Sequence, residues 1–258
     1  MTAPFFYGDP GALVVAKSGD ELVIGGDEGR HAVTVKRLQP GESVLIGDGA
    51  GTCIHGSVAD THGKDQLVVH VEQVVREQMP TPQITVVQAL IKGDRMERAV
   101  ETLTEANVDD IVVWQADRSI ARVNAASAEK VRAKLGLRAA QAAKQARRSW
   151  IPTVSGVLTT PELFTRLSTN SRVVVLHEEA ELALTDAIPV GTAAPTDVVL
   201  VVGPEGGISP RELESLIAVG AVTATMGASV MRSSTAGTVA LGWVMGASGR
   251  WSVGDSDS

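Results

Sequence analysis

Residues 198–212 read VVLVVGPEGGISPRE, and this stretch decides the fold class. Its first five residues, 198–202, are all apolar, which predicts a short strand buried on both faces of a parallel sheet. Residues 209–212 (SPRE) form a capping box with proline at the first helical position, so a helix is expected to begin there. A buried strand that passes through a short glycine-rich loop directly into a helix indicates an α/β protein.

The same alternation of strands and helices extends outward from this stretch. We expect strands at residues 84–91, 111–114, 173–176 and 222–226, and helices from 94, over 127–146, from 160 and over 235–247. The helix after residue 94 is predicted to begin with a capping box of Asp94 and Glu97. Together these elements predict a mostly parallel sheet that is covered by helices on both faces.

Residues 1–76 have a different character, because short β-branched runs replace the longer helical patterns. Expected strands lie at residues 22–24, 43–46, 52–58 and 66–75, with a hairpin at Asp48-Gly49 and a short helix within 28–38. We therefore predict a small domain resembling a β-barrel over residues 1–76. Residues 77–82 are interpreted as a linker, 83–250 as the α/β domain and 251–258 as a disordered tail.

Composition excludes several classes of protein. The 258 residues are 44% apolar and 21% charged, which is enough to build a core in one large or two small domains. No apolar run approaches the ~20 residues needed to span a bilayer, and the first eleven residues do not resemble a signal peptide. Because Cys53 is the single cysteine, we expect no disulfide, no thiolate zinc site and a cytoplasmic location. The five histidines do not complete a ligand set, so no metal is expected.

The distribution of charge favours nucleic acid more than the total does. The net charge is −7, yet residues 118–148 hold nine basic residues and one acid, Glu129. A local basic stripe on an acidic protein is suited to phosphate contacts. A solvated helix face is the alternative interpretation of the same stripe.

Three loops at predicted strand ends are the candidate site. They are residues 176–179 (LHEE), 203–207 (GPEGG) and 226–232 (MGASVMR). Ligands of open α/β sheets bind beyond the carboxyl ends of the strands, and glycines let the backbone approach a ligand. The N–H groups of the helix after residue 209 could face that ligand, although a plain strand–helix connection is the alternative for each loop. Dinucleotide-binding, P-loop and esterase-elbow motifs are absent from the sequence.

The ordered motifs resemble the SPOUT class of S-adenosylmethionine-dependent RNA methyltransferases, and more narrowly the RsmE family. The resemblance rests on GPEGG at 203–207, MGASVMRSSTA at 226–236, QALIKGDRME at 88–97, residues 31–41 and 47–49, and Gln145, Arg148 and Pro152. It implies a deeply knotted parallel sheet, a PUA-like RNA-binding barrel and a homodimer. It further implies S-adenosylmethionine as methyl donor. The implied reaction methylates N3 of one uridine, number 1498 in the family, in 16S rRNA of the small ribosomal subunit.

The site residues follow from this chemistry together with the resemblance. Methylation of uracil N3 leaves charge on the ring, which an arginine would stabilise, so Arg232 is the first catalytic candidate. Arg148 is the second, and Glu205 is a candidate base; an ion pair that holds the loop is the alternative for Arg232. The cofactor candidates are Leu176, His177, Gly203, Glu205, Gly206, Gly207, Met226, Gly227, Val230, Met231 and Ser234. The RNA candidates are Arg30, Lys36, Arg37, Lys92, Arg95, Arg118, Arg122, Arg132, Lys134, Arg138 and Arg147.

Two positions depart from the family pattern. Lys144 and Ser234 stand where the family has glutamates. A non-catalytic RNA-binding or ribosome-assembly factor therefore stays open as an alternative, as do a related methyltransferase acting on another RNA and a small-molecule nucleotide-binding enzyme.

Overall fold

The structure is a computed structural model that describes residues 3–167, 171–191 and 197–251. Of the expected disordered tail, residues 252–258 lie outside the described residues. The chain divides into two compact units. The N-terminal unit consists of Met1–Met79 and Ala143–Ile151, and the C-terminal unit consists of Pro80–Ala142 and Pro152–Ser258.

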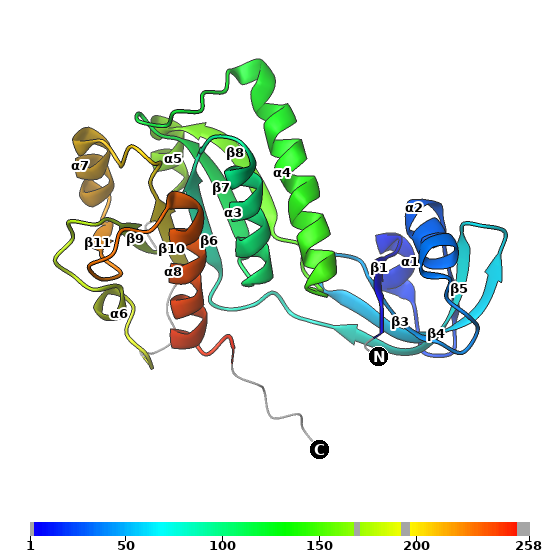
Figure 1. The fold of residues 1–258 in the computed structure, drawn as a ribbon. Helices are drawn as coiled ribbons and strands as arrows, with labels where there is room; N and C mark the ends of the chain where they lie inside the picture. The colour runs from blue at the N-terminus through cyan, green and yellow to red at the C-terminus, as the bar shows by residue number, and fades with distance from the viewer. Residues whose placement is uncertain (1–2, 168–170, 192–196, 252–258) are drawn as a thin grey trace. The chain divides into compact units, whose positions relative to one another are not determined.

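A six-stranded parallel sheet forms the centre of the C-terminal unit (Figure 1). Its spatial order is β11-β9-β10-β6-β7-β8. The bounds are β6 Ile84–Ala89, β7 Asp110–Gln115, β8 Thr153–Thr159, β9 Arg172–Leu176, β10 Val198–Val202 and β11 Val222–Ala224. The strand that the sequence singles out, β10, pairs in parallel with both β6 and β9, and all five of its residues are buried.

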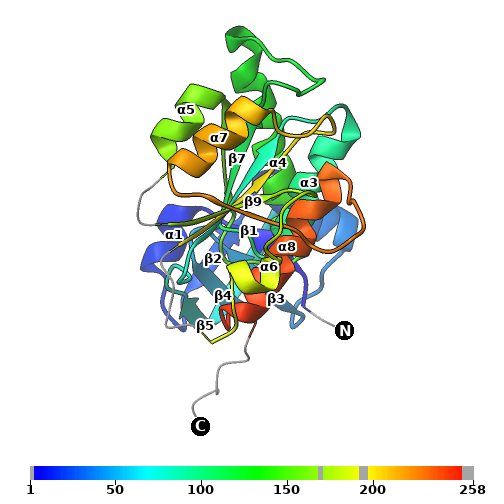
Figure 2. The same ribbon diagram turned by 90° about the vertical axis from the view of Figure 1, so that its left-hand side faces the viewer.

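Helices cover both faces of this sheet, which confirms the predicted fold class (Figure 2). The bounds are α3 Asp94–Glu105, α4 Ala125–Gln145, α5 Thr160–Arg166, α6 Leu184–Ala187, α7 Pro210–Ala218 and α8 Ser233–Ala247. One apolar cluster joins Leu103 of α3 and Leu241 of α8 to the sheet. A second joins Leu163 of α5 and Leu216 of α7 to the opposite face.

The helix starts are predicted with mixed success. The capping box at α7 is confirmed, with the Ser209 hydroxyl accepting from Glu212 N and the Glu212 carboxylate accepting from Ser209 N. The capping box at α3 is wrong, because the N-cap is Gly93 at φ 68° and Asp94 is already helical. The sequence analysis missed β8, whose half-buried Ser155 and Gly156 break the apolar pattern of a core strand.

The N-terminal unit is a five-stranded sheet with the order β1-β3-β4-β5-β2. The bounds are β1 Phe5–Tyr7, β2 Glu21–Ile24, β3 Ser43–Gly47, β4 Thr52–His62 and β5 Gln66–Arg76. The predicted hairpin is confirmed, since β3 and β4 pair antiparallel around Asp48-Gly49. Helix α1 (Pro10–Val15) and helix α2 (Gly26–Arg30), which continues as a π-helix over His31–Lys36, complete this unit. Phe6, Leu13 and Ile54 belong to its core.

Residues 143–151 return to the N-terminal unit from far along the chain. Lys144 forms an ion pair with Glu28 at 2.6 Å, and the Ser149 hydroxyl donates to the Glu77 carboxylate at 2.9 Å. Trp150 forms a β-bridge with Ala50. This nine-residue segment is therefore an integral part of a unit that the sequence analysis confined to residues 1–76.

Within the part of the chain that the structure describes, no helix is both long enough and apolar enough to cross a membrane.

Candidate functional site

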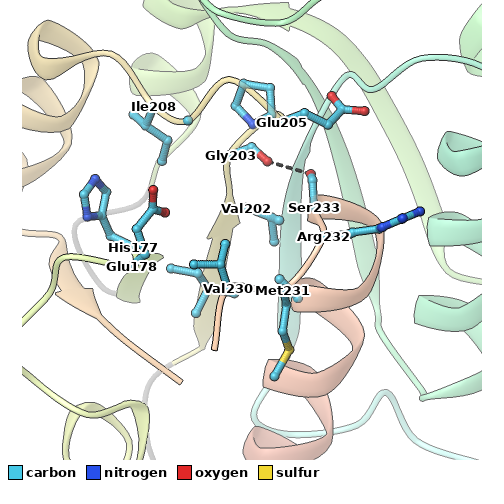
Figure 3. A pocket seen from close by; sticks show the side chains of 14 residues that line it. His177, Glu178, Val202, Gly203, Glu205, Ile208, Val230, Met231, Arg232 and Ser233 are labelled. Carbon is cyan, nitrogen blue, oxygen red and sulfur yellow. Dashed lines mark hydrogen bonds between the residues drawn. The ribbon is translucent and has the colours of Figure 1, made fainter. Parts of the chain in front are cut away.

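A cavity of about 300 Å³ lies at the carboxyl ends of β9 and β10 (Figure 3). The three loops that the sequence singles out all contribute to its wall. Its lining residues are Leu176, His177, Glu178, Val202, Gly203, Pro204, Glu205, Gly207, Ile208, Val230, Met231, Arg232, Ser233 and Ala236. A smaller cavity of about 70 Å³ shares part of this wall and adds Met226, Gly227 and Ser229. The combined space falls near the lower end of the about 300–1,000 Å³ that is usual for small-molecule sites.

The wall combines apolar side chains with five polar ones, His177, Glu178, Glu205, Arg232 and Ser233. Val202 and Ile208 are buried, whereas Val230 on the outer rim is 77% exposed. The loop before α8 contributes Met231, which lies across the cavity from His177 in Figure 3. Such a wall suits a ligand with a flat apolar portion and a small number of polar ends.

The glycine-rich loop needs its glycines for two different reasons. Gly207 has φ +74°, a conformation that a side chain would strain. Gly203 is needed because the Ile208 side chain of the same loop packs against it, and a Cβ there would lie 2.8 Å from Cγ1 of Ile208. A Cβ on Gly206 would lie 3.1 Å from the Arg118 carbonyl oxygen. The loop is therefore held from behind by the residues that follow β7.

Two consecutive hydrogen bonds behind the cavity join β6, the start of α8 and the end of β10. The Gln88 side-chain amide donates to the Ser233 hydroxyl at 2.9 Å, and that hydroxyl donates to the Gly203 carbonyl at 2.6 Å. Gln88 comes from β6, Ser233 from the first turn of α8 and Gly203 from the end of β10. These hydrogen bonds fix the distance between the two loops that form opposite parts of the wall.

The two helix N-termini nearest the loops differ in what they offer a ligand. The first turn of α7 is capped by its own Ser209 and Glu212, and the prediction that its N–H groups face a ligand stays a prediction. Helix α8 begins after Arg232, and no side chain among the described residues caps it. Because Ser233 and Ala236 line the cavity, the N-terminus of α8 lies at the cavity wall.

Charged side chains gather on one side of the cavity. Arg95 of α3 approaches Glu205 at 3.6 Å, and the Glu205 side chain is only 24% exposed. Arg232 also lines the cavity, with its side chain pointing away from His177 and Glu178 in Figure 3. The structure thus brings together Arg232, Glu205 and Arg95, which the sequence analysis assigned to catalysis and RNA contact.

The opposite side carries His177 and Glu178, which follow β9. The His177 Nδ1 atom accepts from Glu179 N at 3.2 Å, so its Nε2 atom is the one left for a ligand. Glu178 lines both cavities and is exposed. His177 is one of the predicted cofactor residues, whereas Glu178 was predicted only as part of the candidate loop 176–179.

Arg148 belongs to the N-terminal unit, where the residue is buried at 8% exposure. Burial raises the pKa of the nearby Tyr7 hydroxyl to about 12, with the positive charge of Arg148 opposing that rise. The predicted catalytic role of Arg148 stays a prediction. Lys144, one of the two departures from the family pattern, lies in the same unit and contacts the ring of Phe6 as well as Glu28.

Several cations of the predicted basic stripe already have acidic partners. Arg132 pairs with Glu129, Lys134 with Glu97 and Arg138 with Glu101. Arg118 donates to the Gly206 carbonyl at 3.4 Å, and Arg122 donates to the Asp117 carbonyl. The remaining RNA candidates, Arg30, Lys36, Arg37, Lys92 and Arg147, are exposed. Their contact with RNA stays a prediction.

Two positions in and behind the cavity wall were not among the predicted site residues. Ser233 lines the cavity, whereas the predicted Ser234 does not. Gln88 was quoted only as part of the family resemblance, although a glutamine inside the apolar strand Ile84–Ala89 is itself a signal of a buried polar role.

Among the described residues, no group of three His, Cys, Asp or Glu side chains could hold a metal ion.

Comparison with known proteins agrees with this geometry. A sequence profile described as an RNA methyltransferase domain matches residues 77–245, and one described as an RNA methyltransferase PUA domain matches residues 18–72. The ribosomal RNA small subunit methyltransferase E of Mycobacterium bovis is 40% identical over 261 residues, which cover 100% of this chain and 97% of that protein. The chain belongs to the ribosomal RNA small subunit methyltransferase E family.

Solved structures share the fold of this methyltransferase E family chain over nearly its whole length. The methyltransferase E of Neisseria gonorrhoeae, bound to S-adenosylmethionine, is 22% identical with a TM-score of 0.81, covering 95% of this chain and 98% of that one. A Legionella pneumophila putative methyltransferase in complex with S-adenosylmethionine is 24% identical with a TM-score of 0.80, covering 96% of this chain and 98% of that one. The N-terminal unit is accordingly a PUA-like domain, and the C-terminal unit has the SPOUT fold.

Proposed function

We propose that this chain uses S-adenosylmethionine to methylate N3 of a uridine in the RNA of the small ribosomal subunit. The observation that carries the proposal is the cavity formed jointly by the loops after β9, β10 and β11. Relatives of the same family are named for methylation of this RNA, and two solved structures of the same fold hold the donor.

The residues of the cavity fit the donor chemically. Leu176, Val202 and Ile208 offer an apolar slot for the adenine ring. The uncapped N-terminus of α8 offers N–H groups to the carboxylate of the methionine portion. Glu178 offers a carboxylate to its ammonium group or to the ribose hydroxyls. When bound, the donor supplies an electrophilic methyl group on a positively charged sulfur.

The arginines on the other side of the cavity suit the acceptor base. Uracil must lose the proton on N3, and the resulting negative charge spreads over N3 and both carbonyl oxygens. Arg232 at the cavity rim would stabilise this charge, with Arg95 nearby. Glu205 is held next to Arg95 and is the candidate for the base that takes the N3 proton. Correct positioning of base and donor supplies much of the remaining rate.

Contacts with RNA phosphates would fix the substrate. The exposed candidates that form no ion pair with another described residue are Arg30, Lys36, Arg37, Lys92 and Arg147. Arg132, Lys134 and Arg138 must first exchange their carboxylate partners for phosphates. We expect reversal of these three charges to weaken binding to ribosomal subunits and to lower its salt dependence. Unchanged binding and activity would remove α4 from the RNA interface.

The experiment that tests the proposal is methyl transfer from labelled S-adenosylmethionine to small ribosomal subunits that lack the modification. Nucleoside mass spectrometry of the product should identify 3-methyluridine. Tight donor binding without transfer would indicate a different RNA substrate. Absence of both would leave an RNA-binding or assembly factor on a methyltransferase scaffold. The knot and the homodimer that the resemblance implies stay predictions.

A further inference from the structure

Gln88 is a fully buried polar side chain that the proposed chemistry does not use. It lies near the end of β6, in a strand whose other residues are Ile, Thr, Val and Ala. Burying an amide costs free energy unless its hydrogen bonds are made. Gln88 Oε1 has no hydrogen-bond partner among the described residues, so only the donor side of the amide is satisfied. A leucine would fill the same space without this cost, which indicates that the amide serves a purpose other than stability.

The hydrogen bonds around Gln88 have a fixed direction. Its Nε2 atom donates to the Ser233 hydroxyl at 2.9 Å and to the Ala89 carbonyl at 3.2 Å. The opposite amide orientation would set Oε1 against that carbonyl oxygen, so the contacts themselves assign nitrogen and oxygen. The Ser233 hydroxyl has one proton, and because it accepts from Gln88 it can give that proton to the Gly203 carbonyl.

The two hydrogen bonds from Gln88 to Ser233 and from Ser233 to Gly203 form a relay that links two segments of the cavity wall. Gly203 begins the glycine-rich loop, and Ser233 begins α8 directly after Arg232. Helix α8 lies against the amide at Gly237, where a Cβ would be in ordinary van der Waals contact with Gln88 Oε1 at 3.5 Å and closer, at 3.2 Å, to a Val202 methyl group. The amide thus lies between β6, β10 and α8, behind the wall of the cavity.

We propose that Gln88 is a positioning residue for the donor cavity, holding the Gly203 loop and the start of α8 in register through the Ser233 hydroxyl. The inference rests on the proposed function in one respect, since it takes the donor to bind in this cavity. It assigns to Gln88 a role in donor affinity although the side chain does not line the cavity.

The central variant is Gln88→Leu. It should raise the Kd and KM for S-adenosylmethionine roughly five- to tenfold, the value of one or two hydrogen bonds, while kcat changes much less. Thermal stability should stay level or rise, because a half-satisfied buried amide has been replaced by an apolar side chain. Gln88→Glu should weaken donor binding further, since an acceptor-only carboxylate draws the Ser233 proton away from Gly203.

Variants of Ser233 test the second step of the relay. Ser233→Ala should weaken donor binding by a similar factor, and the double variant with Gln88→Leu should be little worse than either single variant. Ser233→Thr keeps the hydroxyl and should recover most of the affinity that Ser233→Ala loses. The matched control is Thr104→Val, which removes a fully buried hydroxyl that donates to Val100 O within α3. It should lower thermal stability and leave the donor Kd unchanged.

Hydrogen exchange without any donor separates this inference from the proposed function. In Gln88→Leu the amides of residues 203–208 and the first turn of α8 should exchange faster than in the unaltered protein, while β5 is unaffected. The inference would be overturned if Gln88→Leu changed neither the Kd for the donor nor the exchange rate of the loop amides. If the unaltered protein fails to bind S-adenosylmethionine, the proposed function fails, and loop exchange still decides whether Gln88 positions the loop.

Discussion

Arg232 lines the cavity, and we expect it to act on the acceptor base and not on the donor. Arg232→Ala should lower kcat for methyl transfer by roughly 10²-fold, the usual effect of removing one group that stabilises developing charge. Donor affinity measured by calorimetry should change little, because the cavity is built mainly from other side chains and from backbone. The matched control is Arg211→Ala on α7, an exposed arginine outside the cavity wall. Equal loss of donor binding and turnover in Arg232→Ala would mean that this arginine holds the loop instead.

Cys53 provides a residue-scale test of the N-terminal unit. Burial raises the pKa of its thiol to about 11, and its residue is only 7% exposed. The thiolate is the reactive form, so at pH 8.5 the folded protein should react with a thiol reagent about two orders of magnitude more slowly than a free cysteine. The rate should rise as the pH is raised toward 11. Rapid labelling at pH 8.5 in native buffer would show that this part of the sheet opens readily.

Single residues also differ in whether sequence patterns can assign them to the site. The glycine loop and Arg232 could be assigned to the site because glycine conformations and strand ends carry their own signals. The choice between Ser233 and Ser234 could not be made, since both are small, polar and adjacent at a helix start. Only the packed structure shows that the Ser233 hydroxyl turns inward to the Gly203 carbonyl.

At the scale of single elements, Glu212 joins three parts of the C-terminal unit. Its buried carboxylate accepts from Asp117 N at 2.7 Å, from the Thr160 hydroxyl at 2.8 Å and from Ser209 N. Glu212→Ala should lower the free energy of unfolding by about 2–4 kcal/mol, because three donors lose their acceptor. Chemical denaturation measures this loss. Glu214→Ala, on the exposed face of the same helix, is the control and should change it by less than about 0.5 kcal/mol.

Elements with strong local signals were predicted correctly, and those that depend on distant partners were not. The capping box predicts the start of α7, and the unbroken apolar run predicts β10. Strand β8 has a mixed burial pattern, since it pairs with β7 alone at the edge of the sheet. The capping box expected at Asp94 failed because Gly93 takes a conformation that sets the helix start one residue earlier.

At the scale of the whole molecule, the N-terminal unit is discontinuous in sequence. Its second piece, residues 143–151, directly follows a pattern of alanine and basic residues that predicts only a continuing helix. Nothing in the local sequence indicates that this piece pairs with residues more than sixty positions earlier. Long-range contacts of this kind depend on surfaces that fit each other, here the close approach of the Trp150 ring to Gly51.

This discontinuity predicts that residues 1–79 are not a complete folding unit. A fragment ending at Met79 loses the Lys144–Glu28 ion pair, the Ser149–Glu77 hydrogen bond and the backbone bond from Gly51 N to Ser149 O. It also exposes Gly51, where a Cβ would lie 2.4 Å from the Trp150 ring in the intact protein. We expect the fragment to be less stable than the same fragment joined by a flexible linker to residues 143–151, by about 3 kcal/mol or more.

The comparison uses Trp150, the single tryptophan of the N-terminal unit, as its fluorescence reporter in the linked fragment. Circular dichroism follows the unfolding of both fragments in urea, and a Lys144→Ala version of the linked fragment isolates the ion pair. This pair is partly buried, with Lys144 17% and Glu28 29% exposed, so its loss should account for only about 1 kcal/mol of the difference. Equal midpoints for the fragment with and without residues 143–151 would contradict the prediction. The PUA-like domain would then be self-sufficient, and the returning segment would serve only to connect the two units.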